Sequence, residues 1–127
     1  MIAGALNTNL YAEWLAHIEA EETKDAFSYI VGLAAGLAGY ECHPQLKGVV
    51  PDFRFVKVQK EMTFALIPNK TWLLFYFRLP AVRAGRYSFS SLQTAFDSTS
   101  ENTSGEWTVR LRSISDVQRL WRFLALS

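Results

Sequence analysis

The segment TWLLFYFRL, from Thr71 to Leu79, decides the fold class of this chain. Its interior holds mainly apolar and aromatic residues, and the turn-forming sequence Pro68-Asn69-Lys70 comes just before it. An uninterrupted apolar run of this length is typical of a strand that is covered on both faces, so we predict a central strand here. Alternate residues of a strand point to opposite faces. One face carries Leu73, Phe75, Phe77 and Leu79, and the other carries Trp72, Leu74, Tyr76 and Arg78.

Three further segments with an alternating apolar pattern predict strands around the central one. They are FRFVKV (Phe53–Val58), MTFALI (Met62–Ile67) and WTVRLR (Trp107–Arg112). The short connections between the first three strands of the chain indicate antiparallel pairing. We expect an irregular loop over 80–91, one or two helical turns over 91–98, and a polar, turn-rich segment over 98–106.

Apolar residues spaced by three and four predict helices at both ends of the chain. The first contains Leu10, Tyr11, Trp14, Leu15 and Ile18, the second spans about Lys24 to Ala38, and the last lies within 113–126. In the last helix the apolar stripe is Val117, Leu120, Trp121 and Leu124, and Ser115 and Gln118 have capping-box spacing. The sequence therefore predicts a single α+β domain over 1–127. We expect an antiparallel four-stranded sheet with helices packed mainly on one face, in the order α-α-β-β-β-(α)-β-α.

The second predicted helix runs into the apolar sequence YIVGLAAGLAGY, from Tyr29 to Tyr40. The uncharged run over 26–40 holds fifteen residues, whereas a membrane-spanning helix needs about 20, so we predict no membrane contact. Small residues, among them Gly32, Gly36 and Gly39, gather on one side of this helix. Either they let the first helix approach closely, or they form the contact of a homodimer.

The charge of the chain is distributed unevenly. Residues 1–46 carry one base and six acids, and residues 47–127 carry twelve bases and six acids, although the net charge of all 127 residues is only +1. This asymmetry indicates an anionic partner for the basic part, or attraction between the two parts within one fold. The single cysteine excludes a disulfide within the chain and suits a reducing compartment, so we predict a cytoplasmic protein.

Few residues are available for catalysis. Two histidines and one cysteine are present, without an HExxH or GxSxG motif. The column Glu13–His17–Glu21 has helical spacing but lacks further metal ligands, and Cys42 and His43 are expected in a loop. We therefore predict no catalytic residues, no metal site and no cofactor.

The outer face of the predicted sheet combines positive charge with aromatic rings. If Trp107, Val109 and Leu111 face the core, the arginines between and after them lie outside. Guanidinium groups contact phosphates and aromatic rings stack on bases, as in nucleic-acid binding. The candidate binding residues are Lys57, Trp72, Tyr76, Arg78, Arg110 and Arg112.

These residues favour a non-catalytic binding module with an anionic partner, nucleic acid before acidic protein. Two alternatives stay open. The arginines could serve only to keep the outer face soluble, with the rings packed under their aliphatic stems. The chain could also be a small protein-binding inhibitor or immunity-type protein that uses its acidic helices or the same basic face.

FALIPNKTWLLFYFRLP (64–80) followed by GEWTVRLRSISDVQRLWRFL (105–124) resembles a small uncharacterised bacterial α+β domain. That domain occurs alone or appended to predicted restriction-type nucleases and other defence-linked proteins. The resemblance covers about 22–126 and rests on the strand pair around Pro68-Asn69-Lys70, on Gly105-Glu106-Trp107, and on Ser115 and Asp116. The insertion DSTSENTS (97–104) and the first helix depart from it. The resemblance implies an accessory role near nucleic acid and carries no known active residues.

Overall fold

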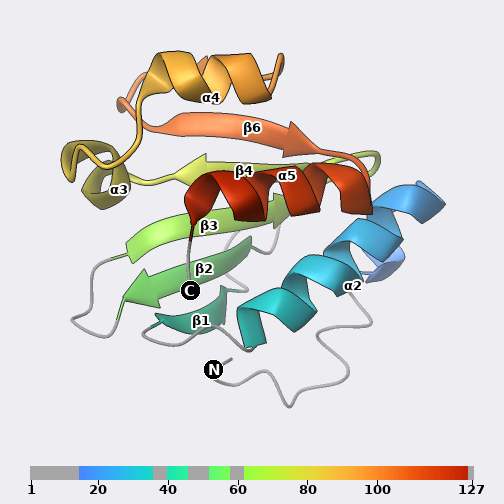
Figure 1. Ribbon diagram of the computed structural model, residues 1–127. Helices are drawn as coiled ribbons and strands as arrows, with labels where there is room; N and C mark the ends of the chain where they lie inside the picture. The colour runs from blue at the N-terminus through green and yellow to red at the C-terminus, as the bar shows by residue number, and fades with distance from the viewer. Residues whose placement is uncertain (1–14, 36–39, 46–51, 58–61, 126–127) are drawn as a thin grey trace.

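A six-stranded antiparallel sheet forms the centre of the computed structural model, with the strand order β1-β2-β3-β4-β6-β5 (Figure 1). The structure describes residues 15–35, 40–45, 52–57 and 62–125. Neighbouring strands up to β4 follow one another in the chain, as the short connections predicted. The strands are β1 (Tyr40–Gln45), β2 (Asp52–Lys57), β3 (Met62–Pro68), β4 (Leu73–Phe77), β5 (Ser100–Glu101) and β6 (Trp107–Leu111).

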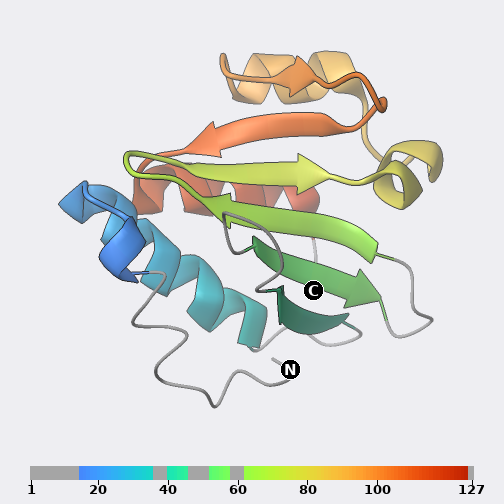
Figure 2. The same cartoon turned by 180° about the vertical axis from the view of Figure 1, so that it is seen from behind.

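Two long helices pack against each other on one face of this sheet, as Figures 1 and 2 show from opposite sides. They are α2 (Glu21–Ala35) and α5 (Ile114–Leu124), and the end of a preceding helix covers residues 15–17. Two short helices, α3 (Leu79–Arg83) and α4 (Phe89–Ala95), lie between β4 and β5 in the chain. The α+β class and the placement of the long helices on one face are thus confirmed.

The core lies between the sheet and the two long helices. In β4 the buried and partly exposed residues alternate, and Leu73, Phe75 and Phe77 are fully buried, as the sequence predicted. The ring of Phe75 lies 5.5 Å from that of Phe64 and 5.7 Å from that of Phe77, measured between centroids. Aromatic pairs at such distances add about 0.5–1.5 kcal/mol each to the stabilisation that comes from burial.

The turn between β3 and β4 attaches α2 to the sheet. The carbonyl oxygen of Lys70 accepts hydrogen bonds from the backbone N–H groups of Glu19 (2.7 Å) and Ala20 (3.0 Å), just before α2 begins. The buried hydroxyl group of Thr23 lies 3.1 Å from the carbonyl oxygens of both Thr71 and Arg112 and donates to them. One helical turn of α2 is therefore joined to the ends of both β4 and β6.

We predict that Thr23→Val destabilises the protein by about 1–3 kcal/mol, because the substitution keeps the shape but leaves two inward-facing carbonyl groups without this donor. The free energy of unfolding in urea measures the effect. Thr94→Val is the matched control, since the Thr94 hydroxyl donates to the Ser90 carbonyl (3.0 Å) on the exposed surface of α4. Equal stability of the two variants would contradict a structural role for Thr23.

The N-cap of α5 lies two residues before the predicted capping box. It is Ser113, whose hydroxyl oxygen accepts a hydrogen bond from the Asp116 backbone N–H (3.3 Å), so Ser115 and Gln118 do not form the cap. The apolar stripe is as predicted, with Val117, Leu120 and Leu124 buried and Trp121 half-buried.

Several boundaries differ from the sequence prediction. The sheet has six strands instead of four, because Tyr40–Gln45 pairs with β2 and Ser100–Glu101 pairs with β6. Cys42 and His43 thus lie in a strand instead of a loop. Leu79–Arg83 is helical instead of irregular, with Pro80 in its first turn, where proline is well tolerated. Helix α2 starts at Glu21 instead of Lys24, since acidic residues favour the first turn of a helix.

The small-residue side of α2 does not form the predicted close contact at the positions that the structure describes. Ser28 and Gly32 are exposed, and a Cβ atom added to Gly32 would meet no atom within 4 Å. Gly36 and Gly39 lie outside the described residues, so the homodimer through this region stays a prediction. Within the described segments, no helix is long and apolar enough to cross a membrane.

Candidate anion-binding site

The pairing of β4 with β6 fixes the order of side chains on the outer face. Leu74 lies opposite Arg110 and Tyr76 lies opposite Thr108. Extending the same register by one residue at each end places Trp72 beside Arg112, and Arg78 beside Glu106. Two of the predicted arginines and Trp72 are therefore gathered at one end of this strand pair, next to the β3–β4 turn.

Arg110 and Trp72 are in direct contact. The guanidinium carbon of Arg110 lies 4.4 Å from the centroid of the Trp72 ring, which is the geometry of a cation–π interaction. The side chains of Arg110 in β6 and of Arg112, which directly follows β6, are both exposed. In the part of the chain that the structure describes, neither guanidinium group forms an ion pair. Their charges are thus available to a ligand.

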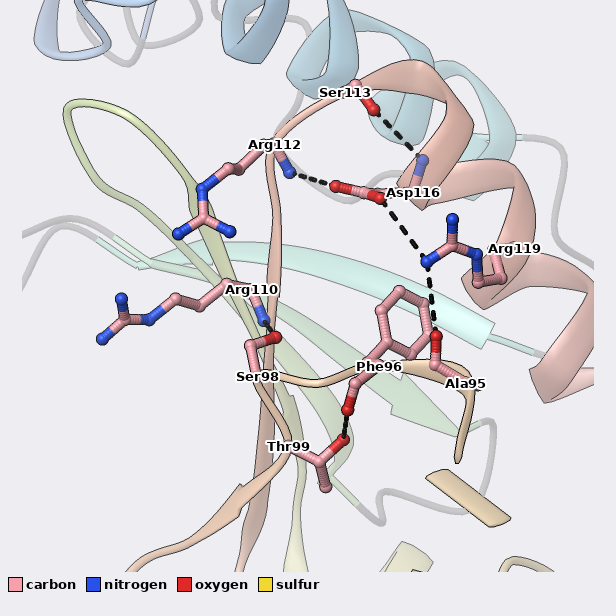
Figure 3. Close-up of polar contacts among 9 residues, drawn as sticks. All are labelled: Ala95, Phe96, Ser98, Thr99, Arg110, Arg112, Ser113, Asp116 and Arg119. Atoms are coloured by element: carbon pink, nitrogen blue, oxygen red, sulfur yellow. Dashed lines mark hydrogen bonds and ion pairs between the residues drawn. The ribbon is translucent and has the colours of Figure 1, made fainter. Parts of the chain in front are cut away.

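The backbone beneath these two arginines is held at the edge of β6. The N–H group of Arg110 donates to the Ser98 hydroxyl oxygen at 2.9 Å, and that of Arg112 donates to a carboxylate oxygen of Asp116 at 2.8 Å. Figure 3 shows both guanidinium groups directed away from Asp116, on the same side of the strand. Side chains from the polar insertion and from α5 therefore fix the strand while its cations project outward.

Arg78 lies at the other end of the strand pair. It is four residues along β4 from Leu74, which is about 13 Å at about 3.3 Å per residue. Its Nε atom forms an ion pair with Glu106, whose side chain is only 13% exposed and also accepts a hydrogen bond from the Asn102 amide (3.1 Å). The charge of Arg78 is thus already compensated within the fold.

The outer face is partly exposed over β4 and β6 but is closed over the Thr63–Ala65 part of β3. Ala65 lies opposite Tyr76 and is buried, as is Thr63, whereas Trp72, Leu74 and Tyr76 are partly exposed. Lys57 lies in β2, where its side chain is outside the described residues. The surface that joins the candidate residues is therefore narrower than the whole sheet.

Two adjoining hollows follow β6 from the sheet face to α5, and we call them together the arginine groove. The first, of about 400 Å³, includes Leu74, Thr99 and Thr108, and the second, of about 300 Å³, includes Phe96, Asp116 and Arg119. They share Asp97, Ser98, Arg110 and Arg112. The residues that line the groove thus include three arginines, several hydroxyl-bearing residues and two aspartates.

Arg119 is held in place on the α5 side of the groove. Its Nη1 atom lies 3.3 Å from the Ala95 carbonyl oxygen and 3.8 Å from a carboxylate oxygen of Asp116 (Figure 3). Its guanidinium carbon lies 5.4 Å from the centroid of the Phe96 ring. Because Asp116 also accepts the Arg112 N–H, both of its carboxylate oxygens face positive groups or donors.

Sequence reasoning missed Asp97, Ser98 and Arg119. Arg119 follows Asp116 by three residues on α5, and this spacing was the available signal for the pair. The contacts of Asp97 and Ser98 depend on how the insertion folds beside β6, which local patterns do not report. Within the described residues, no three side chains among His, Cys, Asp and Glu are grouped as metal ligands.

Neither a family model, nor a curated protein, nor a solved structure matches this chain. The resemblance to a defence-linked bacterial domain therefore stays a prediction, and the residues of the arginine groove themselves carry the functional argument.

Proposed function

We propose that the protein is a non-catalytic binding module that contacts single-stranded nucleic acid through the arginine groove and Trp72. The observation that carries this proposal is the pair of exposed guanidinium groups of Arg110 and Arg112, which form no ion pair among the described residues, and of which that of Arg110 is stacked on Trp72 at 4.4 Å. Arg78 and Lys57 are not needed for this contact.

The chemistry of the stacked arginine suits a single strand. A guanidinium group is planar and rigid, so it can contact a phosphate with two parallel N–H groups while its face stacks on a base. The Trp72 ring holds Arg110 in one orientation before a ligand binds, which lowers the entropy lost on binding. Bases of a single strand are free to stack on such a surface, whereas bases of a duplex are already stacked on each other.

The partner could also be an acidic protein, because carboxylates are recognised by the same bidentate contacts. The distribution of charge, with twelve bases and six acids over 47–127, is compatible with either partner. Stacking favours nucleic acid over an acidic protein, because Trp72 and Arg110 offer a flat surface on which a base can stack. A bacterial or phage defence context is a further proposal, supported only by the sequence resemblance.

We predict that the affinity for a labelled single-stranded oligonucleotide falls with salt, with a slope of log K against log salt of about −1.4 to −2.1. This range corresponds to two or three neutralised phosphates at about 0.7 each. Fluorescence anisotropy titrations between low and physiological salt measure the slope. A slope near zero, or binding to no oligonucleotide at low salt, would contradict the proposed function and favour a protein partner.

A further inference from the structure

We infer that a separate hollow beside Trp72 holds one unstacked base of the bound strand and selects adenine. This hollow, of about 470 Å³, lies at the β3–β4 turn, and we call it the turn hollow. The turn and the segment just before α2 line it, with the residues His17, Glu19, Asn69, Lys70, Thr71 and Trp72. The inference rests on the proposed function, and it adds a site outside the arginine groove that reads the sequence of the strand.

The lining of the turn hollow suits an uncharged group better than a phosphate. Its lysine and its glutamate compensate each other, since the Nζ atom of Lys70 lies 3.9 Å from a carboxylate oxygen of Glu19. Trp72 and His17 are aromatic, and bases that leave the stack of a single strand pack on rings of both kinds. The phosphates of a strand therefore fit the arginines of the groove, and a base fits the turn hollow.

Trp72 connects the turn hollow with the arginine groove. The guanidinium carbon of Arg110, a residue that lines the groove, lies 4.4 Å from the centroid of the Trp72 ring. Trp72 itself lines the turn hollow. A phosphate bound at Arg110 is thus separated from the turn hollow by a single aromatic residue, so a base of the same strand can reach it.

The backbone around the turn hollow is fixed before a ligand binds. The Lys70 carbonyl oxygen accepts hydrogen bonds from the N–H groups of Glu19 (2.7 Å) and Ala20 (3.0 Å), which joins the two segments that line the hollow. Figures 1 and 2 both show the β3–β4 turn beside the start of α2. Within the turn, the Asn69 N–H donates to the Trp72 carbonyl oxygen at 2.9 Å. A ligand therefore meets a preformed frame, and less conformational freedom is lost on binding.

The side-chain amide of Asn69 indicates which base is selected. One of its N–H groups lies 3.5 Å from the Ile67 carbonyl oxygen, which is a long hydrogen bond, and the amide has no other partner among the described residues. An amide presents a donor next to an acceptor, and this pair matches the N7 acceptor and the 6-amino donor of adenine. Thymine and uracil lack an amino group. An unstacked adenine exposes the required edge, so it can form both hydrogen bonds with Asn69.

The test compares three labelled strands, each titrated by fluorescence anisotropy against the full chain at the same low salt concentration. They are octathymidylate and the same strand with one central thymine replaced by adenine or by purine, which lacks the 6-amino group. We expect the adenine strand to bind about tenfold more tightly than octathymidylate, as is typical of one bidentate contact between an amide and a base. The purine strand should bind within about threefold of octathymidylate, because it stacks on the same rings but cannot form both hydrogen bonds.

Asn69→Ala should bring the affinities for the adenine strand and octathymidylate within about twofold of each other, with circular dichroism and urea denaturation showing that the variant is folded. An unchanged preference in folded Asn69→Ala, or equally tight binding of the adenine and purine strands, would overturn the inference. The purine comparison needs no variant, so it decides the question even if Asn69→Ala does not fold. If the parent protein binds all three strands equally, the adenine site fails and the proposed function stands. If it binds none of them, the proposed function fails and the adenine site fails with it.

Discussion

Phe77→Ala is expected to lower the free energy of unfolding by about 3–5 kcal/mol, the cost typical of removing a buried phenyl ring. Phe77 is fully buried in β4, and its ring centroid lies 5.4–6.2 Å from those of five other aromatic residues. These neighbours come from β3, β4 itself, β6, α5 and the segment before α4. They are Phe64, Phe75, Tyr87, Trp107 and Phe123.

This loss of unfolding free energy in Phe77→Ala is large, because small domains are stable by only about 5–15 kcal/mol. Urea denaturation followed by tryptophan fluorescence measures it. Phe77→Leu serves as the control, since it keeps most of the apolar volume and should cost about 1–1.5 kcal/mol. If Phe77→Ala were as stable as Phe77→Leu, the core would not be organised around β4.

The central strand could be predicted because its sequence reports its environment directly. An apolar residue at every position of 73–77 predicts a strand that is covered on both faces. The structure buries Leu73, Phe75 and Phe77 on the helix side but leaves Leu74 and Tyr76 partly exposed on the outer face, so this part of the prediction holds for one face only. Helix α5 could be predicted for the same reason, because the spacing of its apolar residues marks a stripe distinct from its polar side. In both elements local pattern and tertiary position agree.

β1 could not be predicted from local pattern. The sequence YECHPQ has no clean alternation, and Pro44 within it argues against a strand in the interior of a sheet. The structure places this strand at the edge of the sheet, where a missing N–H group is tolerated. Its place follows from backbone pairing with β2, the next strand along the chain, and such pairing leaves no alternating pattern of side chains in the sequence.

The candidate site was predictable in part. Alternation of side chains predicted that Trp72, Arg110 and Arg112 share the outer face, and in the structure the strand register brings these three together at one end of it, with Arg110 in contact with Trp72. It could not show that Arg78 is paired with Glu106, because that pairing depends on the register between the two strands. The third arginine that lines the groove, Arg119, comes from α5, whose position beside β6 is set by tertiary packing.

The second large effect is expected for binding. Arg110→Ala combined with Arg112→Ala should weaken the affinity for single-stranded nucleic acid about 100-fold at low salt. Each variant removes a charge-assisted contact worth about 1.5 kcal/mol or slightly more, and every 1.4 kcal/mol corresponds to a factor of ten. Because both side chains are exposed, the free energy of unfolding should change by less than about 1 kcal/mol.

A matched control separates this site from the overall charge of the protein. Arg83→Ala combined with Arg122→Ala removes the same two charges from exposed positions on α3 and α5, outside the arginine groove. General attraction between a basic surface and a polyanion would respond equally to both double variants.

The most direct measurement is therefore an anisotropy titration of one labelled single-stranded oligonucleotide against the parent protein and the two double variants at the same low salt concentration. The proposed site predicts that the parent and Arg83→Ala/Arg122→Ala bind within about threefold of each other, while Arg110→Ala/Arg112→Ala binds about 100-fold more weakly. Equal affinities of the two double variants, or no binding by the parent protein, would contradict a nucleic-acid site at Arg110 and Arg112.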